Sequence, residues 1–289
     1  MQLSIVVPIY KNAKNAIQQI KNVIKFLNDE YSTFELIFII DDKNIDEQVV
    51  NSLMIDKHIS LYYLDKNYGQ HFATLCGFYK AKGDIIVSID EDMMQYLPQL
   101  KTINIYNTND VLYFNYNKYE MYKSSVRRIF SKLFNNTFLL ISNIDYHSSF
   151  RVISKHTRDK ILQQKHIFCN LDLMLHESTN NIQAIPLNTA GLSDAESLYN
   201  FKSLSVFAFK FIFESNPLLL TLILFSILSI IYYFYTNSFF QTILFYATSA
   251  SLFALLIFFS KKNTRDTKFK IEQAINHQKN NITVLNSSI

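Results

Sequence analysis

Three consecutive acidic residues, Asp90, Glu91 and Asp92, directly follow an apolar run in the segment GDIIVSIDEDMMQ. Like charges at the end of a buried strand repel one another unless a cation lies among them. Asp90 and Asp92 are separated by one residue, so a short turn can direct both carboxylates into the same cleft. Two carboxylates, with phosphate oxygens and waters, form the oxygen-rich octahedral site that suits Mg²⁺ or Mn²⁺. The spacing therefore predicts a divalent metal site at Asp90 and Asp92 that also holds a diphosphate.

The same pair has a simpler explanation. An acidic residue at the end of a strand often caps the next helix by accepting hydrogen bonds from its first N–H groups. On the pair alone both explanations stay open, and the elements around the pair must decide between them.

The first 90 residues alternate between apolar runs and amphipathic stretches, which predict buried strands and helices respectively. Strands are predicted at residues 3–10, 34–40, 59–65 and 84–90, and helices at residues 12–29 and 69–83. Continuous apolar strands that alternate with helices predict an α/β fold with a mostly parallel sheet covered on both faces. Such sheets bind ligands at the carboxyl ends of their strands. Acidic residues follow two of these ends, at Asp41–Asp42 and Asp90–Asp92.

Two glycines bound the predicted helix at residues 69–83. Gly69 is expected to let the chain turn tightly into the helix, and Gly83 to end it in a left-handed conformation that a side chain would resist. The whole chain has four glycines, and three of them fall within this block, so a structural reason for each is expected.

Two long uncharged runs follow near the C-terminus, at residues 217–235 and 238–260. Each is about 20 residues long, the length a helix needs to cross the ~30 Å hydrocarbon core of a bilayer. They predict two transmembrane helices, with a buried helical hairpin as the alternative. The flanking segment Lys261–Lys270 is basic, so both ends are expected in the cytoplasm.

The predicted organisation has four parts. Residues 1–198 form a cytosolic catalytic domain, residues 199–215 an amphipathic helix in the membrane surface, residues 216–260 the two spans, and residues 261–289 a basic and polar cytosolic tail. The alternative for residues 199–215 is an ordinary amphipathic helix packed on the domain. We expect the chain to be a multi-pass protein of the inner, cytoplasmic membrane.

Composition excludes other classes of protein. The net charge is +4 and the basic residues are dispersed, so no nucleic-acid partner is expected. Cys76 and Cys169 lie outside any metal-binding spacing, and they predict two reduced thiols. The N-terminus shows the pattern of a strand, and we expect no cleavable signal peptide. His71 and His147 have no partner at ligand spacing and are interpreted as surface or packing residues.

Four segments carry a resemblance to a known family: SIVVPIYKN at residues 4–12, IIDDKNID at 39–46, NYGQHFATLCGFYKAKGDIIVSIDED at 67–92 and SSFRVISK at 148–155. Their order resembles the family 2 glycosyltransferases of the GT-A fold. More narrowly it resembles the polyprenyl-phosphate glycosyltransferases, which include dolichyl-phosphate mannose synthase and the bacterial enzymes that glycosylate undecaprenyl phosphate. The third segment is the strongest match, and two C-terminal membrane helices are usual in the bacterial members.

The resemblance implies an inverting transfer from a UDP- or GDP-linked sugar to a polyprenyl phosphate, for cell-envelope glycan or lipid modification. It implies that the donor contacts Pro8, Tyr10, Asp42, Gln70, Asp90, Glu91 and Arg151, and that Asp90 and Asp92 bind Mg²⁺ or Mn²⁺. Pro8 and Tyr10 would line the base pocket, Asp42 would lie near the base ring, and Arg151 would contact the diphosphate. Small enzymes of this type also assemble through their spans, so a homo-oligomer is a further expectation.

The acceptor side of the reaction has candidate residues of its own. Asp92 is expected to act in catalysis through the metal, and Asp145 and Asp172 are candidate bases, with surface carboxylates as the alternative. The acceptor phosphate is expected to bind basic residues, with a solvated basic face as the alternative. These residues are Lys123, Arg127, Arg128 and Lys202.

The chain also departs from the family pattern. Lys11-Asn12 stands where Asn-Glu is usual, Lys43-Asn44 replaces Gly-Ser, and Ser149 stands where an Asp often precedes Phe-Arg. Two alternatives to a polyprenyl-phosphate enzyme therefore stay open. One is a glycosyltransferase that extends a lipid-linked or growing polysaccharide, and the other is a non-catalytic membrane partner with a degenerate glycosyltransferase fold.

Overall fold

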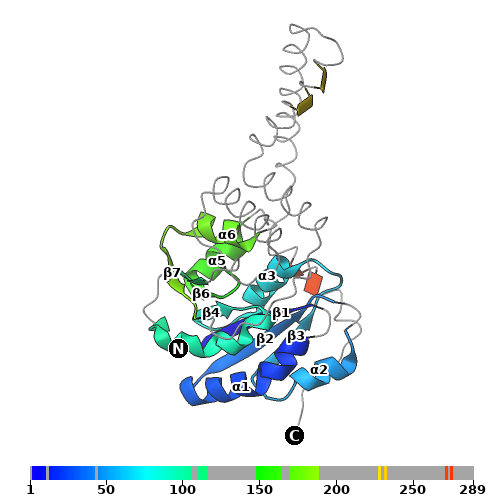
Figure 1. Cartoon of the computed structure of the whole chain (residues 1–289), viewed down its shortest axis with the longest axis vertical. Helices are drawn as coiled ribbons and strands as arrows, with labels where there is room; N and C mark the ends of the chain where they lie inside the picture. Colours follow the sequence, from blue (N-terminus) through cyan, green and yellow to red (C-terminus); the bar gives the residue numbers. More distant parts are fainter. Residues whose placement is uncertain are drawn as a thin grey trace. The chain divides into compact units, whose positions relative to one another are not determined.

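The computed structural model (Figure 1) describes residues 2–10, 13–42, 45–105, 110–115, 148–164 and 170–188, and also 227–228, 231–232, 271–272 and 274–275. The chain divides into two compact units. The first comprises residues 1–121, 145–194 and 266–289, and the second comprises residues 122–144 and 195–265. All the elements described below belong to the first unit.

The first unit is built on one seven-stranded sheet. In chain order its elements are β1 (Leu3–Ile9), α1 (Lys14–Glu30), β2 (Phe34–Ile40), α2 (Glu47–Leu53), β3 (Ile59–Tyr63), α3 (Gln70–Lys80), β4 (Ile85–Ser88), the 3₁₀ helix η1 (Glu91–Thr102), β5 (Val111–Asn115), β6 (Arg151–Ser154), α5 (Lys155–Gln163), α6 (Leu171–Ser178) and β7 (Ile182–Pro186).

The strands lie in the order β3-β2-β1-β4-β6-β5-β7. Only β6 runs antiparallel to its neighbours β4 and β5, and the other described pairs are parallel. The predicted α/β fold with a mostly parallel sheet is therefore confirmed. Each of the six elements predicted within the first 90 residues is present, and β2 has the predicted bounds. The carboxyl ends of β1, β2 and β4 share one edge of the sheet.

Helices cover both faces of the sheet, as the apolar strands require. Leu3, Ile5 and Val7 of β1 pack in one core cluster with residues of α1 and η1. Val6, between them, packs in a second cluster with residues of α3, α5 and α6. Figure 1 shows α1 and α3 on either side of the central strands. The alternation follows from the period of two in a strand, because successive side chains point to opposite faces.

The glycines around α3 have two different roles. Gly69 has φ +91°, so the predicted tight turn into the helix is confirmed. A Cβ at Gly77 would lie 2.1 Å from Val6 Cγ1, so this glycine lets α3 approach β1 closely. The left-handed conformation predicted for Gly83 is wrong, because Gly69 is the only glycine with positive φ in the described part of the chain. At Gly83 a Cβ would instead meet Ser4 Oγ at 2.6 Å.

The predicted membrane segments lie almost wholly outside the described residues. No described helix is long and apolar enough to span a bilayer. Within the first predicted span the structure describes four helical residues, and three of these carry large apolar side chains that are exposed by 45–60%. These three are Ile227, Leu228 and Ile231.

Candidate active site

The acid pair lies at the junction of β4 and η1. Asp90 occupies the position before the first residue of η1, but its side chain makes no capping hydrogen bond. Instead, Asp90 Oδ1 accepts a hydrogen bond from Gln70 Nε2, the side chain of the first residue of α3. The capping explanation therefore fails for Asp90. The carboxylate is directed across the sheet edge toward the start of α3.

The three acids differ in exposure, and Glu91 has a shifted pKa. Asp92 is exposed, whereas Asp90 and Glu91 are half-buried. Burial, followed by the neighbouring charges of Asp92 and Asp90, raises the pKa of Glu91 to about 7. Glu91 Oε2 is buried and has no hydrogen-bond partner among the described residues. Three crowded carboxylates and an unsatisfied buried oxygen are features that a bound cation would stabilise.

The donor set limits what the chain alone can offer a metal. The described residues contain no group of three or more His, Cys, Asp or Glu side chains placed to hold an ion. Asp90 and Asp92 supply hard oxygen ligands, and a divalent ion at this place would complete its coordination with phosphate oxygens and water. The residues thus fit a metal that arrives with a diphosphate, rather than one caged by protein ligands.

Asp41 ties the end of β2 to the loop before α3. Its Oδ1 accepts a hydrogen bond from the Tyr68 amide and its Oδ2 one from the Gly69 amide, both at 2.7 Å. The side chain is only 2% exposed, and burial raises its pKa to about 6 although the two hydrogen bonds lower it. Asp41 therefore fixes the backbone that immediately precedes Gln70.

The sequence singled out Asp42 as the site residue and missed the role of Asp41. The alternation of side chains along the strand could have revealed the role of Asp41. Ile37 and Ile39 pack in the cluster that α3 covers, so Asp41, two residues further, continues that face. Asp42 is half-buried and continues the opposite face.

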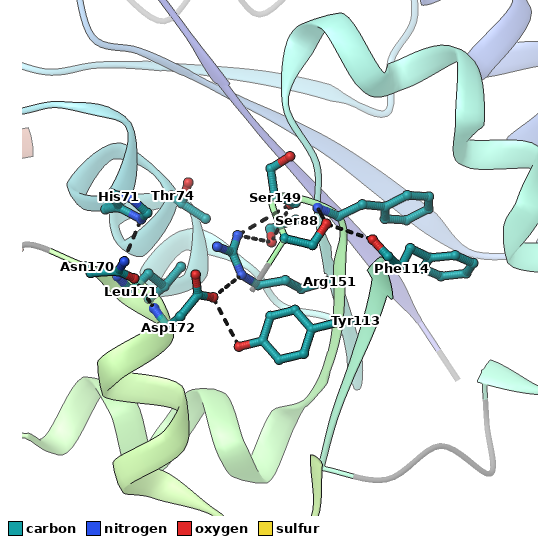
Figure 2. Close-up of polar contacts among 12 residues, drawn as sticks. His71, Thr74, Ser88, Tyr113, Phe114, Ser149, Arg151, Asn170, Leu171 and Asp172 are labelled. Atoms are coloured by element: carbon teal, nitrogen blue, oxygen red, sulfur yellow. Dashed lines mark hydrogen bonds and ion pairs between the residues drawn. The ribbon is translucent and has the colours of Figure 1, made fainter. Parts of the chain in front are cut away.

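A buried polar network surrounds Arg151 (Figure 2). Arg151, the first residue of β6, is paired across the sheet with Ser88 of β4 and Tyr113 of β5. Arg151 Nε donates to Asp172 Oδ1 at 2.8 Å, and its Nη1 lies 3.4 Å from both Ser88 Oγ and the Ser149 carbonyl. The Tyr113 hydroxyl donates to the same Asp172 oxygen at 3.0 Å. The guanidinium therefore has three hydrogen-bond partners.

The Arg151–Asp172 ion pair is almost fully buried, with exposed fractions of 4% and 3%. Burial alone would lower the pKa of Arg151, but the Asp172 carboxylate outweighs it, so the net shift is upward. Asp90 contributes to the same upward shift, which puts the guanidinium within electrostatic reach of the acid pair. Asp172 is thus a buried partner of Arg151, and the alternative of a surface carboxylate is wrong for it. Its predicted role as a base stays a prediction.

The structure places the other predicted donor residues at the same edge. Pro8 is buried in β1 opposite Ile39 of β2, past the last residue that pairs with β4. Tyr10 follows the end of β1 and is 40% exposed, and Asp42 follows the end of β2. His71 Nδ1 accepts from the Leu171 amide at 3.3 Å, which is a packing role.

Several predicted residues cannot be placed. Those outside the described residues are Asp145, Lys123, Arg127, Arg128, Lys202, His147 and Cys169, together with Lys11, Asn12, Lys43 and Asn44.

Comparison with known proteins agrees with the geometry. Residues 4–158 match the profile of the family described as "Glycosyl transferase family 2". The chain belongs to this family. The predictions of family 2 membership and of a glycosyltransferase are therefore confirmed.

Relatives of this family 2 chain point to one kind of enzyme. The chain is 32% identical over 98 residues to an undecaprenyl-phosphate 4-deoxy-4-formamido-L-arabinose transferase from Proteus mirabilis, a match covering 32% of this chain and 29% of the relative. It is 23% identical over 211 residues to the protein of the same name from Shewanella sediminis, covering 70% of this chain and 63% of the relative. Each match spans less than two thirds of the relative's length.

A solved structure supports the fold of this family 2 chain. Glucosyl-3-phosphoglycerate synthase from Mycobacterium tuberculosis, in complex with uridine diphosphate, aligns with a TM-score of 0.50 at 15% identity. The alignment covers 73% of this chain and 78% of that chain. At this identity the likeness shows the fold alone, which agrees with the predicted GT-A class.

Proposed function

We propose that this family 2 glycosyltransferase moves a sugar from a UDP- or GDP-linked donor to a polyprenyl phosphate at the cytoplasmic face of the inner membrane. The observation that carries the proposal is the shared sheet edge where Asp41 fixes Gly69 and Gln70 contacts Asp90. The relatives named as undecaprenyl-phosphate transferases support the choice of acceptor. The product would serve cell-envelope glycan or lipid modification.

On the donor side, Asp90 and Asp92 would hold Mg²⁺ or Mn²⁺. The ion would neutralise charge on the leaving nucleoside diphosphate. Gln70 orients the Asp90 carboxylate through its side-chain hydrogen bond. Arg151 adds a positive charge, and its guanidinium is oriented by the hydrogen bond to Asp172. Pro8, Tyr10 and Asp42 would bind the base.

The transfer itself needs little from a base. An oxygen of the lipid phosphate attacks the anomeric carbon, the bond from that carbon to the diphosphate oxygen breaks, and its electron pair leaves with the nucleoside diphosphate. Attack from the opposite face inverts the configuration. A phosphate oxygen is already ionised at pH 7, so no proton has to be removed from the nucleophile. Asp145 and Asp172 remain the proposed bases if one acts.

On the acceptor side, we place the lipid phosphate near Lys123, Arg127, Arg128 and Lys202, and the chain in the membrane through two spans. The exposed apolar residues Ile227, Leu228 and Ile231 suit contact with lipid. Residues 145–194 and 266–289 belong to one compact unit. If the chain crosses a bilayer, its return to the same folded unit requires an even number of crossings, which agrees with two spans and puts both termini on one side.

The direct test is transfer of label in membranes that contain the full chain. Membranes are incubated with undecaprenyl phosphate and a series of radiolabelled nucleotide sugars. The proposal predicts label in a lipid that mild acid cleaves, and loss of that label in Asp90→Ala/Asp92→Ala. Asp29→Ala is the matched control, because Asp29 is exposed near the C-terminal end of α1, at the opposite edge of the sheet.

Two other outcomes would refute the proposal. Label that enters only polymer would favour the transferase that extends a polysaccharide. Absence of transfer from every donor would favour the non-catalytic partner.

A further inference from the structure

Four described residues near the C-terminus, Ile271, Glu272, Ala274 and Ile275, are here called the tail segment. They pack within the first unit, on the side of the sheet that α3 covers. Ile271 and Ala274 are fully buried and Ile275 is 9% exposed. Ile271 and Ile275 lie in the same apolar cluster as Val6 and Phe78, on the face that α3 covers. Residues that follow the predicted membrane spans therefore complete the core around α3.

Two polar contacts attach the tail segment at defined points. The Tyr79 hydroxyl, on the last turn of α3, donates to Glu272 Oε1 at 2.8 Å. The Asp65 amide, just after β3, donates to the Ala274 carbonyl at 3.3 Å. The contact with Glu272 is also the main reason that the pKa of Tyr79 is raised. One contact thus holds α3, and the other holds the start of the loop that leads into α3.

That loop, Asp65–Gly69, leads from the tail segment to the site. Burial, followed by the neighbouring Asp65 side chain, raises the pKa of Tyr68. The Tyr68 and Gly69 amides donate to the Asp41 carboxylate at 2.7 Å. Both ends of the Asp65–Gly69 loop are therefore fixed, one by Ala274 and the other by Asp41.

The loop ends where the donor site begins. Gly69 is the residue before α3 and has a φ of +91°, which glycine adopts without strain. Its carbonyl accepts from the Ala73 amide in the first turn of the helix. The next residue, Gln70, donates to Asp90. A shift of the loop would move Gln70 relative to Asp90, because no residue separates Gly69 from Gln70.

We propose that the tail segment is a positioning element of the donor site, which holds the Asp65–Gly69 loop so that Gln70 and Asp90 are in place for the donor diphosphate. The inference rests on the proposed function only in assigning donor binding to this sheet edge. Glu272 and Tyr79 are positioning residues, since neither touches the acid pair.

The test uses the full chain, with substitutions that alter the hydrogen bond between Tyr79 and Glu272. Glu272→Ala and Tyr79→Phe each remove the hydrogen bond, whereas Glu272→Gln keeps an oxygen that accepts it. Glu30→Ala is the matched control, because Glu30 pairs with Lys101 at the surface and both side chains are partly exposed.

The first readout is hydrogen exchange, which does not depend on activity. Loss of one hydrogen bond corresponds to about a fivefold change in a local opening equilibrium. We expect amides of the Asp65–Gly69 loop to exchange about fivefold faster in Glu272→Ala and Tyr79→Phe, and at the wild-type rate in Glu272→Gln and Glu30→Ala. The double variant should be no faster than either single one, because both remove the same contact. Unchanged loop exchange, or equal acceleration in β1 and β4, would overturn the inference.

The second readout is donor binding. We expect Glu272→Ala and Tyr79→Phe to raise the donor KM about fivefold while kcat stays within twofold of the wild type. Both variants should also weaken the binding of UDP or GDP with Mn²⁺ about fivefold. Faster loop exchange with unchanged nucleotide affinity would overturn the inference. The wild-type chain tests the proposed function separately, because that proposal fails if the wild type binds neither nucleotide and transfers no sugar.

Discussion

The buried pair of Arg151 and Asp172 makes the sharpest prediction about stability. Asp172→Ala leaves a guanidinium that is 4% exposed without its charged partner, and it removes the acceptor of the Tyr113 hydroxyl. Removal of one partner from a buried ion pair destabilises a protein by about 3–5 kcal/mol. We therefore expect the free energy of unfolding to fall by about that amount, which is a large share of the roughly 5–15 kcal/mol of a typical domain.

Urea unfolding of the detergent-solubilised chain, followed by circular dichroism, measures this loss. The matched control is Glu30→Ala, because Glu30 Oε1 lies 2.6 Å from Lys101 Nζ and the two side chains are 32% and 53% exposed. Loss of such a surface pair should change stability by about 0–1 kcal/mol. If Asp172→Ala lost no more stability than Glu30→Ala, burial would not determine the strength of the Arg151 contact.

A double variant separates the structural role of the pair from its functional role. Arg151→Met/Asp172→Leu removes both charges, and apolar replacement of a buried pair is often neutral or stabilising. We expect the double variant to recover most of the stability lost by Asp172→Ala but to lose transferase activity, because no positive charge remains beside Asp90. A double variant as unstable as Asp172→Ala would refute the reasoning from an unpaired charge.

Further predictions concern residues around α3. Burial raises the pKa of Asp41 from 3.8 to about 6. The wild type should therefore be most stable relative to Asp41→Asn below pH 4. Its advantage in unfolding free energy should fall by up to about 3 kcal/mol as the pH rises through 6. A difference that stays flat or rises with pH in urea titrations would contradict this. Gly77→Ala places a Cβ 2.1 Å from Val6 Cγ1 and should destabilise by about 1–3 kcal/mol. Gly69→Ala meets no atom within 4 Å, so it should lose only about 1–2 kcal/mol from backbone strain. A smaller loss in Gly77→Ala than in Gly69→Ala would show that close packing of α3 on β1 is not the decisive cost.

Most of the first half of the fold could be predicted because its strands are apolar along most of their length. Phe34–Ile40 is an example, and its bounds agree with the prediction. The elements after residue 90 were not predicted from the pattern, because β6 and η1 carry no clear period. The reversed direction of β6 depends on pairing of Ile153 with Ile86, residues far apart in sequence. A local pattern does not specify such a partner.

The site was predictable in part for similar reasons. Like charges after a strand pointed to Asp90 and Asp92 without any knowledge of the fold. The partner of Arg151 was not predictable, because α6 carries Asp172 and its approach to β6 is a tertiary contact. Asp172 was expected as a base or a surface carboxylate, and its burial follows from packing that the sequence does not show.

The central claim is that Asp90 and Asp92 bind a nucleoside diphosphate through a divalent ion. Isothermal titration calorimetry of the full chain with UDP and with GDP, each with Mn²⁺ and with excess chelator, tests it most directly. We predict binding of one nucleotide that requires the ion and that weakens about 100-fold or more in Asp90→Ala/Asp92→Ala, with Asp29→Ala unchanged. Equal affinity in the wild type and the double variant, or binding that persists with chelator, would contradict the claim.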